Sequence, residues 1–349
     1  MWDQSLIEKI RSETYILDIY KASGNNPSIS SVAVELIKTV QDIYRYLEPS
    51  HFMGKIIVCI SLNGNKILPG EAEEIQYNKN TLITKTTQSI LLQSIDNDLF
   101  MWENIEVDSV LRMSKILFYY YSKKEEYFIV NKSKISIKSM QGCCSIYSLY
   151  YFYLTESLAH YSVEKILNSS CDHFKKSWAD RKQIYFKNKP EGDMQISLRE
   201  YLSSTLRGVE VTREFSLNAK KPVDIRIHWN SANRSALIEV KWLGVSLNED
   251  ANRISTSYSK GRAVEGAKQL KEYLDLAARD LPSIIIKGYL VVIDGRRKNI
   301  SEHVVSQISQ EDGLYYQSTD LIFPDEADYN KIISNFEKPI RMFTRPICQ

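Results

Sequence analysis

The chain has 349 residues, of which 43% are hydrophobic and 25% are charged, a composition that excludes a wholly disordered protein. The length favours two domains, because single cores seldom grow past about 250 to 300 residues. A formal net charge of +2 is too small to identify a polyanionic partner. Residues 171–270 nevertheless carry 18 Lys and Arg against 12 Asp and Glu, so basic side chains are concentrated in one part of the chain.

The cysteines and the apolar segments indicate in which cellular compartment the protein is expected. The cysteines lack the paired spacing of a zinc site or a disulfide framework, which predicts reduced thiols. The N-terminal MWDQSLIEKIRSE is interrupted by acidic residues, unlike a secretory signal. The most apolar stretch, residues 145–154, is far shorter than the roughly 20 residues that a bilayer requires. These features predict a cytoplasmic protein without membrane contact.

The first half of the chain gives few clear patterns. Two helices are expected between Met1 and about Pro49, on either side of a GNNPS break, and KIIVCIS at residues 55–61 is expected to be a strand. A long helix is expected from about Ser145 to His173, where the tyrosines could stack on bases but are more typical of a core. We therefore expect residues 1–190 to be a mostly helical region that recruits a protein partner or substrate.

The second half, residues 191–349, shows a clearer order of elements after a polar boundary at residues 187–193. A helix is expected at 195–207, followed by strands at 209–217, 222–229 and 235–243. A polar loop from Gly244 to about Gly261 leads to a helix at 263–280, and a strand buried on both faces is expected at 283–294. This order predicts a mixed α/β domain in which helices flank a sheet that contains a hairpin.

The expected hairpin of the second and third strands carries the candidate catalytic residues. If it is centred on Ser231 and Ala232, Asp224 lies directly opposite Glu239, with Cβ atoms about 4.5 to 5.5 Å apart. Lys241 lies two residues beyond Glu239 and points to the same face. Two adjacent carboxylates repel each other unless a proton or a cation compensates, and Mg²⁺ does this well. A bound cation could polarise a phosphodiester, and Lys241 could orient the attacking water.

Over about residues 194–295 this arrangement resembles the PD-(D/E)xK nuclease superfamily, which includes restriction endonucleases and RecB-like nucleases. Asp224 matches the family aspartate, and Glu239, Val240 and Lys241 match the (D/E)xK element, although Pro222 is not adjacent to Asp224. The resemblance implies a restriction-endonuclease-like fold, binding of Mg²⁺ or Mn²⁺ by the two acids, and cleavage of nucleic-acid phosphodiesters.

Further residues extend the resemblance along the two expected helices. Gln269 and Tyr273 stand at i and i+4 on one side of the second helix and match the QxxxY element of RecB-like members. Glu200, on the helix before the first strand, lies where many members have another acidic residue, so it is a candidate metal ligand. The alternative is that Glu239 and Lys241 are solvated strand residues and that Tyr273 serves packing.

Basic residues near the second helix are candidates for nucleic-acid contact. Lys260 and Arg262 lie just before the N-terminus of this helix and could bind backbone phosphates, and Arg253 lies in the same polar loop. A solvated mobile loop is the alternative. Arg296, Arg297 and Lys298 pose the same choice, with surface solubility favoured.

Together these patterns predict a Mg²⁺-dependent endonuclease that acts on DNA, with RNA left open. By analogy with the family it would be a restriction or antiphage defence effector, and it could act as a homodimer. One alternative is a catalytically silent module of the same fold that binds nucleic acid or a protein. Another is a nuclease that cleaves transposon ends or junctions, which would use the same chemistry.

Overall fold

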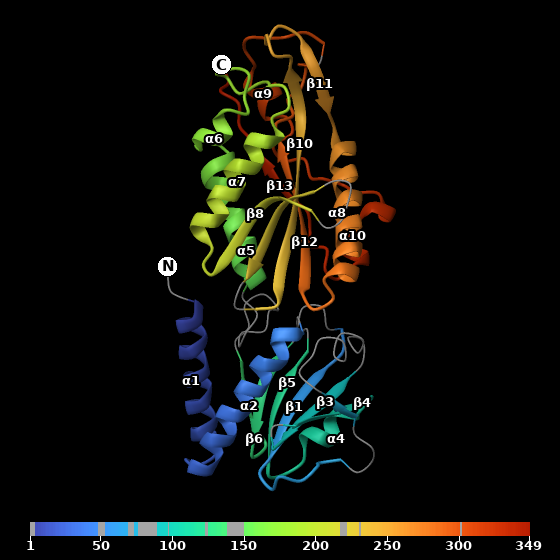
Figure 1. Cartoon of the computed structure of the whole chain (residues 1–349). Helices are drawn as coiled ribbons and strands as arrows, with labels where there is room; N and C mark the ends of the chain where they lie inside the picture. The colour runs from blue at the N-terminus through green and yellow to red at the C-terminus, as the bar shows by residue number, and fades with distance from the viewer. Residues whose placement is uncertain are drawn as a thin grey trace. The chain divides into compact units, whose positions relative to one another are not determined.

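The computed structural model describes residues 4–47, 53–68, 73–75, 89–96, 98–122, 125–137, 150–216, 222–229, 232–300 and 302–349 (Figure 1). The chain divides into two compact units, one of residues 1–152 and 282–285, the other of residues 153–281 and 286–349. Each unit has its own mixed sheet, so the predicted α/β class is confirmed. Within the described ranges, no helix is both long and apolar enough to cross a bilayer.

Two helices open the N-terminal unit, as the sequence predicts. They are α1 (Gln4–Ala22) and α2 (Pro27–Tyr46). The break between them ends at Asn26, whose side chain accepts a hydrogen bond from the Ser28 backbone N–H at 3.0 Å. Pro27 follows as the first helical residue, where its missing N–H costs nothing. The GNNPS segment therefore stops one helix and starts the next.

A seven-stranded sheet accompanies these helices, in the order β2-β4-β3-β1-β5-β6-β7. Helix α2 packs on β1 and β5, where its Tyr44 ring lies against Tyr119. The short helix α4 (Val107–Leu111) covers the other face, with Ile57 and Cys59. Of these strands, the sequence predicts only β1. The strands are β1 (Ile56–Ser61), β2 (Glu73–Ile75), β3 (Ile90–Ile95), β4 (Asp98–Glu103), β5 (Ile116–Tyr121), β6 (Glu126–Val130) and β7 (Ser133–Ser136).

The segment after residue 150 differs from its prediction in two respects. The expected long helix is interrupted: α5 (Tyr150–Tyr161) runs into a π-helical turn (Ser162–Ile166), and α6 (Asp172–Lys175) follows after a break. The first residues of the expected long helix, 145–149, lie outside the described residues. Residues 153–190 also belong to the C-terminal unit, so the boundary predicted at residues 187–193 is displaced. The physical reason is Phe186, which is buried and exchanges backbone hydrogen bonds with Val245 and Leu247.

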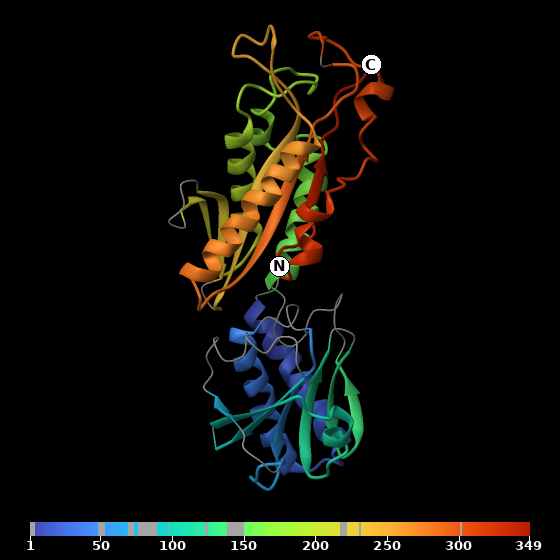
Figure 2. The same cartoon turned by 90° about the vertical axis from the view of Figure 1, so that its right-hand side faces the viewer.

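The C-terminal unit is built on a six-stranded sheet in the order β13-β12-β10-β9-β8, with β11 also paired to β10. Helices α7 and α8 lie on opposite sides of β10 (Figures 1 and 2). The predicted order of helix, three strands, helix and strand is present. The strands are β8 (Val209–Phe215), β9 (Val223–Trp229), β10 (Arg234–Leu247), β11 (Ile254–Tyr258), β12 (Ile285–Asp294) and β13 (Ile340–Phe343). The helical elements are α7 (Glu191–Thr205), α8 (Lys260–Asp280), α9 (Gln310–Leu314), a 3₁₀ turn (Asp325–Ala327) and α10 (Tyr329–Ile332).

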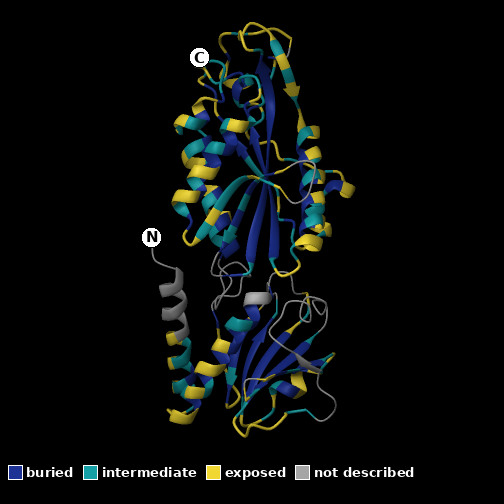
Figure 3. Ribbon diagram, in the orientation of Figure 1, coloured by how far each residue is buried: buried dark blue, intermediate teal, exposed yellow. Residues whose placement is uncertain are grey.

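The hairpin of β9 and β10 has the register that the sequence predicts. Arg234 pairs with Trp229 and Ile238 pairs with Ile225, so Asp224 and Glu239 come one step beyond the last of these pairs. Buried and partly exposed residues alternate along β9, and Val223 is buried. Strands β10 and β12 are buried along their whole length (Figure 3). The pleat of β9 thus turns Asp224 away from the apolar core face.

Strand β10 is longer than expected, and half of the polar loop predicted from Gly244 to Gly261 is sheet. β10 continues to Leu247, and β11 returns alongside it from Ile254 to Tyr258. The intervening turn is fixed by Asn248, whose side chain accepts hydrogen bonds from the backbone N–H groups of Asn252 and Arg253 at 3.1 Å. Small polar residues of β11 alternate between partly buried and exposed positions, which is why this strand resembles a loop in the sequence.

Candidate active site

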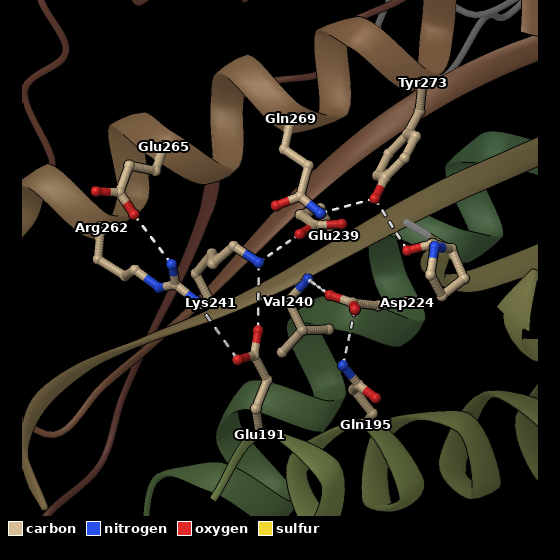
Figure 4. A network of polar contacts seen from close by, with 11 residues as sticks. Glu191, Gln195, Asp224, Glu239, Val240, Lys241, Arg262, Glu265, Gln269 and Tyr273 are labelled. Carbon is tan, nitrogen blue, oxygen red and sulfur yellow. Dashed lines mark hydrogen bonds and ion pairs between the residues drawn. The ribbon is translucent and has the colours of Figure 1, made fainter. Parts of the chain in front are cut away.

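Polar side chains from four elements meet at the end of the β9–β10 ladder (Figure 4). Strand β9 contributes Asp224, and β10 contributes Glu239 and Lys241. Helices α7 and α8 supply the remaining members, which are Glu191, Gln195, Arg262, Gln269 and Tyr273. The structure therefore brings together the three residues that the hairpin argument selected.

Asp224 is held in place through both of its carboxylate oxygens. Oδ1 accepts a hydrogen bond from Gln195 Nε2, and Oδ2 accepts one from the Val240 backbone N–H, each at 2.7 Å. Burial raises the pKa of Asp224 to about 6, while the Lys241 ammonium and the Val240 N–H act in the opposite direction. Each oxygen keeps a lone pair beyond the one that is used, so the carboxylate is oriented but can still accept a ligand.

Glu239 is the most deeply buried acid of the cluster, with 0% of its surface exposed. Its Oε1 is ion-paired with Lys241 Nζ, whereas its Oε2 is buried without a hydrogen-bond partner among the described residues. Burial, reinforced by the negative charge of Asp224, raises the pKa of Glu239 to about 8. An unsatisfied buried carboxylate oxygen is costly, so this atom needs a proton or a cation as its partner.

Lys241 is almost as buried as Glu239, with 3% of its surface exposed. Its Nζ contacts Glu239 and also Glu191 Oε1, at 3.2 Å. Burial alone would lower the pKa of Lys241, but the surrounding acids outweigh it and raise the pKa. The aliphatic stem runs beneath α8, where a Cβ atom on Gly266 would lie 2.6 Å from Lys241 Cγ. Glycine at this position thus lets the helix lie directly on the lysine.

The acidic residue on the preceding helix is Glu191, and the prediction of Glu200 is corrected. The Glu200 side chain is paired instead with His173, at 3.2 Å between Oε2 and Nε2. Glu191 and Gln195 are four residues apart and share one side of α7, whereas Glu200, five residues beyond Gln195, is rotated away from it. Sequence reasoning missed Glu191 because α7 was expected to begin at residue 195. The i, i+4 spacing of Glu191 and Gln195 was the available signal.

Gln269 and Tyr273 share one side of α8, as predicted, and connect the helix to β9. Gln269 Nε2 donates to the Tyr273 hydroxyl at 2.7 Å, and that hydroxyl donates to the Pro222 carbonyl at 2.9 Å. Burial raises the pKa of Tyr273, so the phenol stays protonated and keeps donating. This chain of bonds fixes the position at which β9 enters the site, two residues before Asp224.

The three residues predicted to contact nucleic acid lie in different surroundings. Arg253 and Lys260 are exposed, in the β10–β11 turn and at the start of α8. Arg262 belongs to the site itself, because its guanidinium is ion-paired with Glu191 at 3.6 Å and with Glu265 at 3.0 Å. Only Arg262 of the three is therefore in contact with the acidic cluster.

Two other sets of charged residues are structural. Asp180, which with Arg181 and Lys182 also fits the (D/E)xK pattern, accepts hydrogen bonds from the backbone N–H groups of Lys182, Ile184 and Tyr185. The surface role favoured for residues 296–298 is corrected at Arg297, which is 5% exposed and donates to Thr344 Oγ1 at 3.0 Å.

The fit of the cluster to a divalent metal can be judged from its donors. Within the described part of the chain, no group of three His, Cys, Asp or Glu side chains could hold a metal ion as placed. Asp224 and Glu239 nevertheless interact electrostatically, and Glu239 Oε2 is unpartnered. Mg²⁺ is commonly bound by one or two carboxylates and completes its shell with water and substrate phosphate. The two acids therefore fit Mg²⁺ or Mn²⁺, with Glu191 as an adjacent third acid.

The cluster combines a buried amine with acids of raised pKa, and such combinations concentrate at catalytic sites. Asp224, Glu239 and Glu191 outnumber Lys241 and Arg262 by one charge when all are ionised. This negative balance favours cations and, with a cation bound, an anionic substrate. Comparison of the chain with known protein families, with curated proteins and with solved structures found no match.

Proposed function

We propose that the C-terminal unit is a metal-dependent nuclease that hydrolyses phosphodiester bonds of DNA. The observation that carries the proposal is the buried Glu239 carboxylate, which has one oxygen paired with Lys241 and the other unpartnered beside Asp224. The PD-(D/E)xK pattern of the sequence supports it, because the same three residues that match the pattern meet in space.

Each residue has a role that follows from its contacts. Asp224 and Glu239 would hold Mg²⁺ or Mn²⁺, which supplies Lewis acidity and lowers the pKa of bound water. Gln195 and the Val240 N–H keep Asp224 oriented, and Glu191 is available as a further acid. Lys241 carries a localised positive charge that would orient the attacking water and offset negative charge developing on the phosphate. Tyr273 and Gln269 would position the start of β9.

The alternative is a module of the same fold in which Lys241 and its acids form only a structural ion-pair network. It would bind nucleic acid or protein without cutting. Free thiols at Cys59, Cys171 and Cys348 support a cytoplasmic setting for either function, and defence against foreign DNA remains a proposal by analogy with the family.

Cleavage assays on the full chain separate the two functions. Plasmid, linear duplex and RNA would be incubated with wild type and Lys241→Ala, each with Mg²⁺, Mn²⁺ or chelator. We expect cutting of DNA that chelator abolishes and that Lys241→Ala reduces at least about 100-fold. The matched control is Lys271→Ala, which removes a partly exposed lysine of α8 paired with Asp275. Absence of cutting by the wild type, or metal-dependent cutting retained in Lys241→Ala, would overturn the proposed mechanism.

A further inference from the structure

Arg262 occupies an unusual position between the acidic cluster and an aromatic ring. It lies in the first turn of α8, and its guanidinium carbon is 4.8 Å from the centre of the Tyr258 ring. Tyr258 is supported in turn by Trp242, with ring centres 4.8 Å apart. A guanidinium packed over a ring face keeps its N–H groups in its own plane, where the ring does not block them.

Arg262 uses little of its hydrogen-bonding capacity among the described residues. A guanidinium has five N–H donors. One terminal nitrogen donates to Glu265 at 3.0 Å, and the other lies 3.6 Å from Glu191 Oε2, an ion pair longer than a hydrogen bond. Nε is buried and has no partner in the part of the chain that the structure describes. A residue placed only to stabilise α8 would be expected to have these donors satisfied.

Glu191 is shared between two cations. Its Oε1 lies 3.2 Å from Lys241 Nζ, while its Oε2 faces Arg262 (Figure 4). While Glu191 neutralises Arg262, an incoming phosphate meets a carboxylate as well as a guanidinium. If the charge of Glu191 were taken up by a divalent cation beside Asp224 and Glu239, that screening of Arg262 would be removed.

We propose that Arg262 binds a backbone phosphate of the nucleic acid next to the cleavage site, and that Glu191 is the carboxylate it exchanges for that phosphate. This inference rests on the proposed function. Binding of a divalent cation and binding of the nucleic acid then favour each other, because each draws one partner away from the Glu191–Arg262 pair. Such coupling is reciprocal by thermodynamic necessity. Arg262 is a substrate-binding residue in this scheme, and the fork geometry of its guanidinium suits two phosphate oxygens.

The test compares two affinities in the full chain. A short fluorescein-labelled DNA duplex would be titrated with wild type, Arg262→Gln and Lys268→Gln, in Ca²⁺ to slow cleavage and at several salt concentrations. Binding of Mn²⁺ without DNA would be measured by calorimetry. We expect Arg262→Gln to weaken DNA binding about tenfold and to reduce the slope of log K against log salt by about one. Its Mn²⁺ affinity should be unchanged or higher, because a competing cation has left Glu191.

The controls separate this role from a structural one. Lys268, exposed on another side of α8, should leave both affinities unchanged when it becomes Gln. Arg262→Lys keeps the charge but not the fork, so it should preserve the salt slope and still weaken DNA binding. The inference would be overturned if Arg262→Gln bound DNA with the same affinity and salt slope as the wild type. It would also be overturned if the variant lost DNA binding and Mn²⁺ binding together. If the wild type cuts DNA and Arg262→Gln keeps the wild-type DNA affinity and salt slope, only this inference fails. If the wild type neither cuts DNA nor binds Mn²⁺, the proposed function itself fails.

Discussion

Replacing Glu239 with Gln should make the stability of the protein less sensitive to pH. Glu239 is buried and its pKa is raised to about 8, so the folded protein retains a proton that the unfolded chain releases near pH 4.5. The stabilisation is complete below pH 4.5 and is lost as the pH rises through about 8. Glutamine has nearly the same shape and cannot ionise, so this loss disappears.

The size of the effect follows from the displacement of the pKa. Each tenfold change in proton affinity corresponds to about 1.4 kcal/mol. A rise from 4.5 to about 8 therefore corresponds to an upper figure of about 5 kcal/mol in the free energy of unfolding. Relative to the variant, the wild type should lose up to this amount between pH 5 and pH 9. The variant should also lose divalent-cation binding, because the atom that replaces Oε2 is no longer anionic.

The assay is urea unfolding of the full chain in chelator, at steps of pH from 5 to 9. Three of the five tryptophans, Trp178, Trp229 and Trp242, lie in the C-terminal unit, so most of the fluorescence signal comes from that unit. Glu265→Gln is the matched control, since it removes one exposed carboxylate beside the same cluster and leaves Glu239 in place. If the stabilities of Glu239→Gln and wild type ran parallel across this range, the carboxyl would titrate normally and the argument from burial would be refuted.

Two further predictions concern the framework of the C-terminal unit. Gly244→Ala should lower the free energy of unfolding by about 2 to 4 kcal/mol, because Gly244 has φ 136° and a Cβ there would lie 2.9 Å from the Gly295 carbonyl oxygen. Its control is Gly261→Ala, where the described residues leave that space open; equal urea midpoints for the two variants would contradict the prediction. Asp294→Asn should cost about 3 to 5 kcal/mol, because buried Asp294 pairs with both Arg296 and Arg341. A change in urea midpoint no larger than that of Asp275→Asn, which replaces an exposed acid paired with Lys271, would show that those arginines find other partners.

The centre of the candidate site could be predicted from the sequence because a hairpin converts spacing into geometry. Once β9 and β10 were assigned and the turn was placed, the pleat determined which residues oppose each other. The pairing of Ile238 with Ile225 confirms that register. The helical stripe of α8 could be predicted for the same reason, since Ala263, Ala267 and Leu270 recur with the helical period and are buried.

Other parts of the structure could not be predicted because they depend on contacts distant in sequence. Glu191 looked like part of a linker, and its role depends on where α7 packs against Lys241. Arg297 resembles a surface residue, and its burial depends on Thr344, which is far along the chain. In the N-terminal unit, β1 lies between β3 and β5 rather than beside the next strand, an order that local patterns do not encode.

The glycine at position 266 has a consequence for how the candidate site could be altered. Its missing side chain leaves room for Lys241 and for Leu290, whose Cδ1 would lie 2.9 Å from an added Cβ. The location of the ammonium is therefore determined by the spacing between a helix backbone and a strand, as well as by its charged partners. A methyl group at this position would act on the chemistry through displacement alone, and a mutational survey confined to ionisable residues would overlook it.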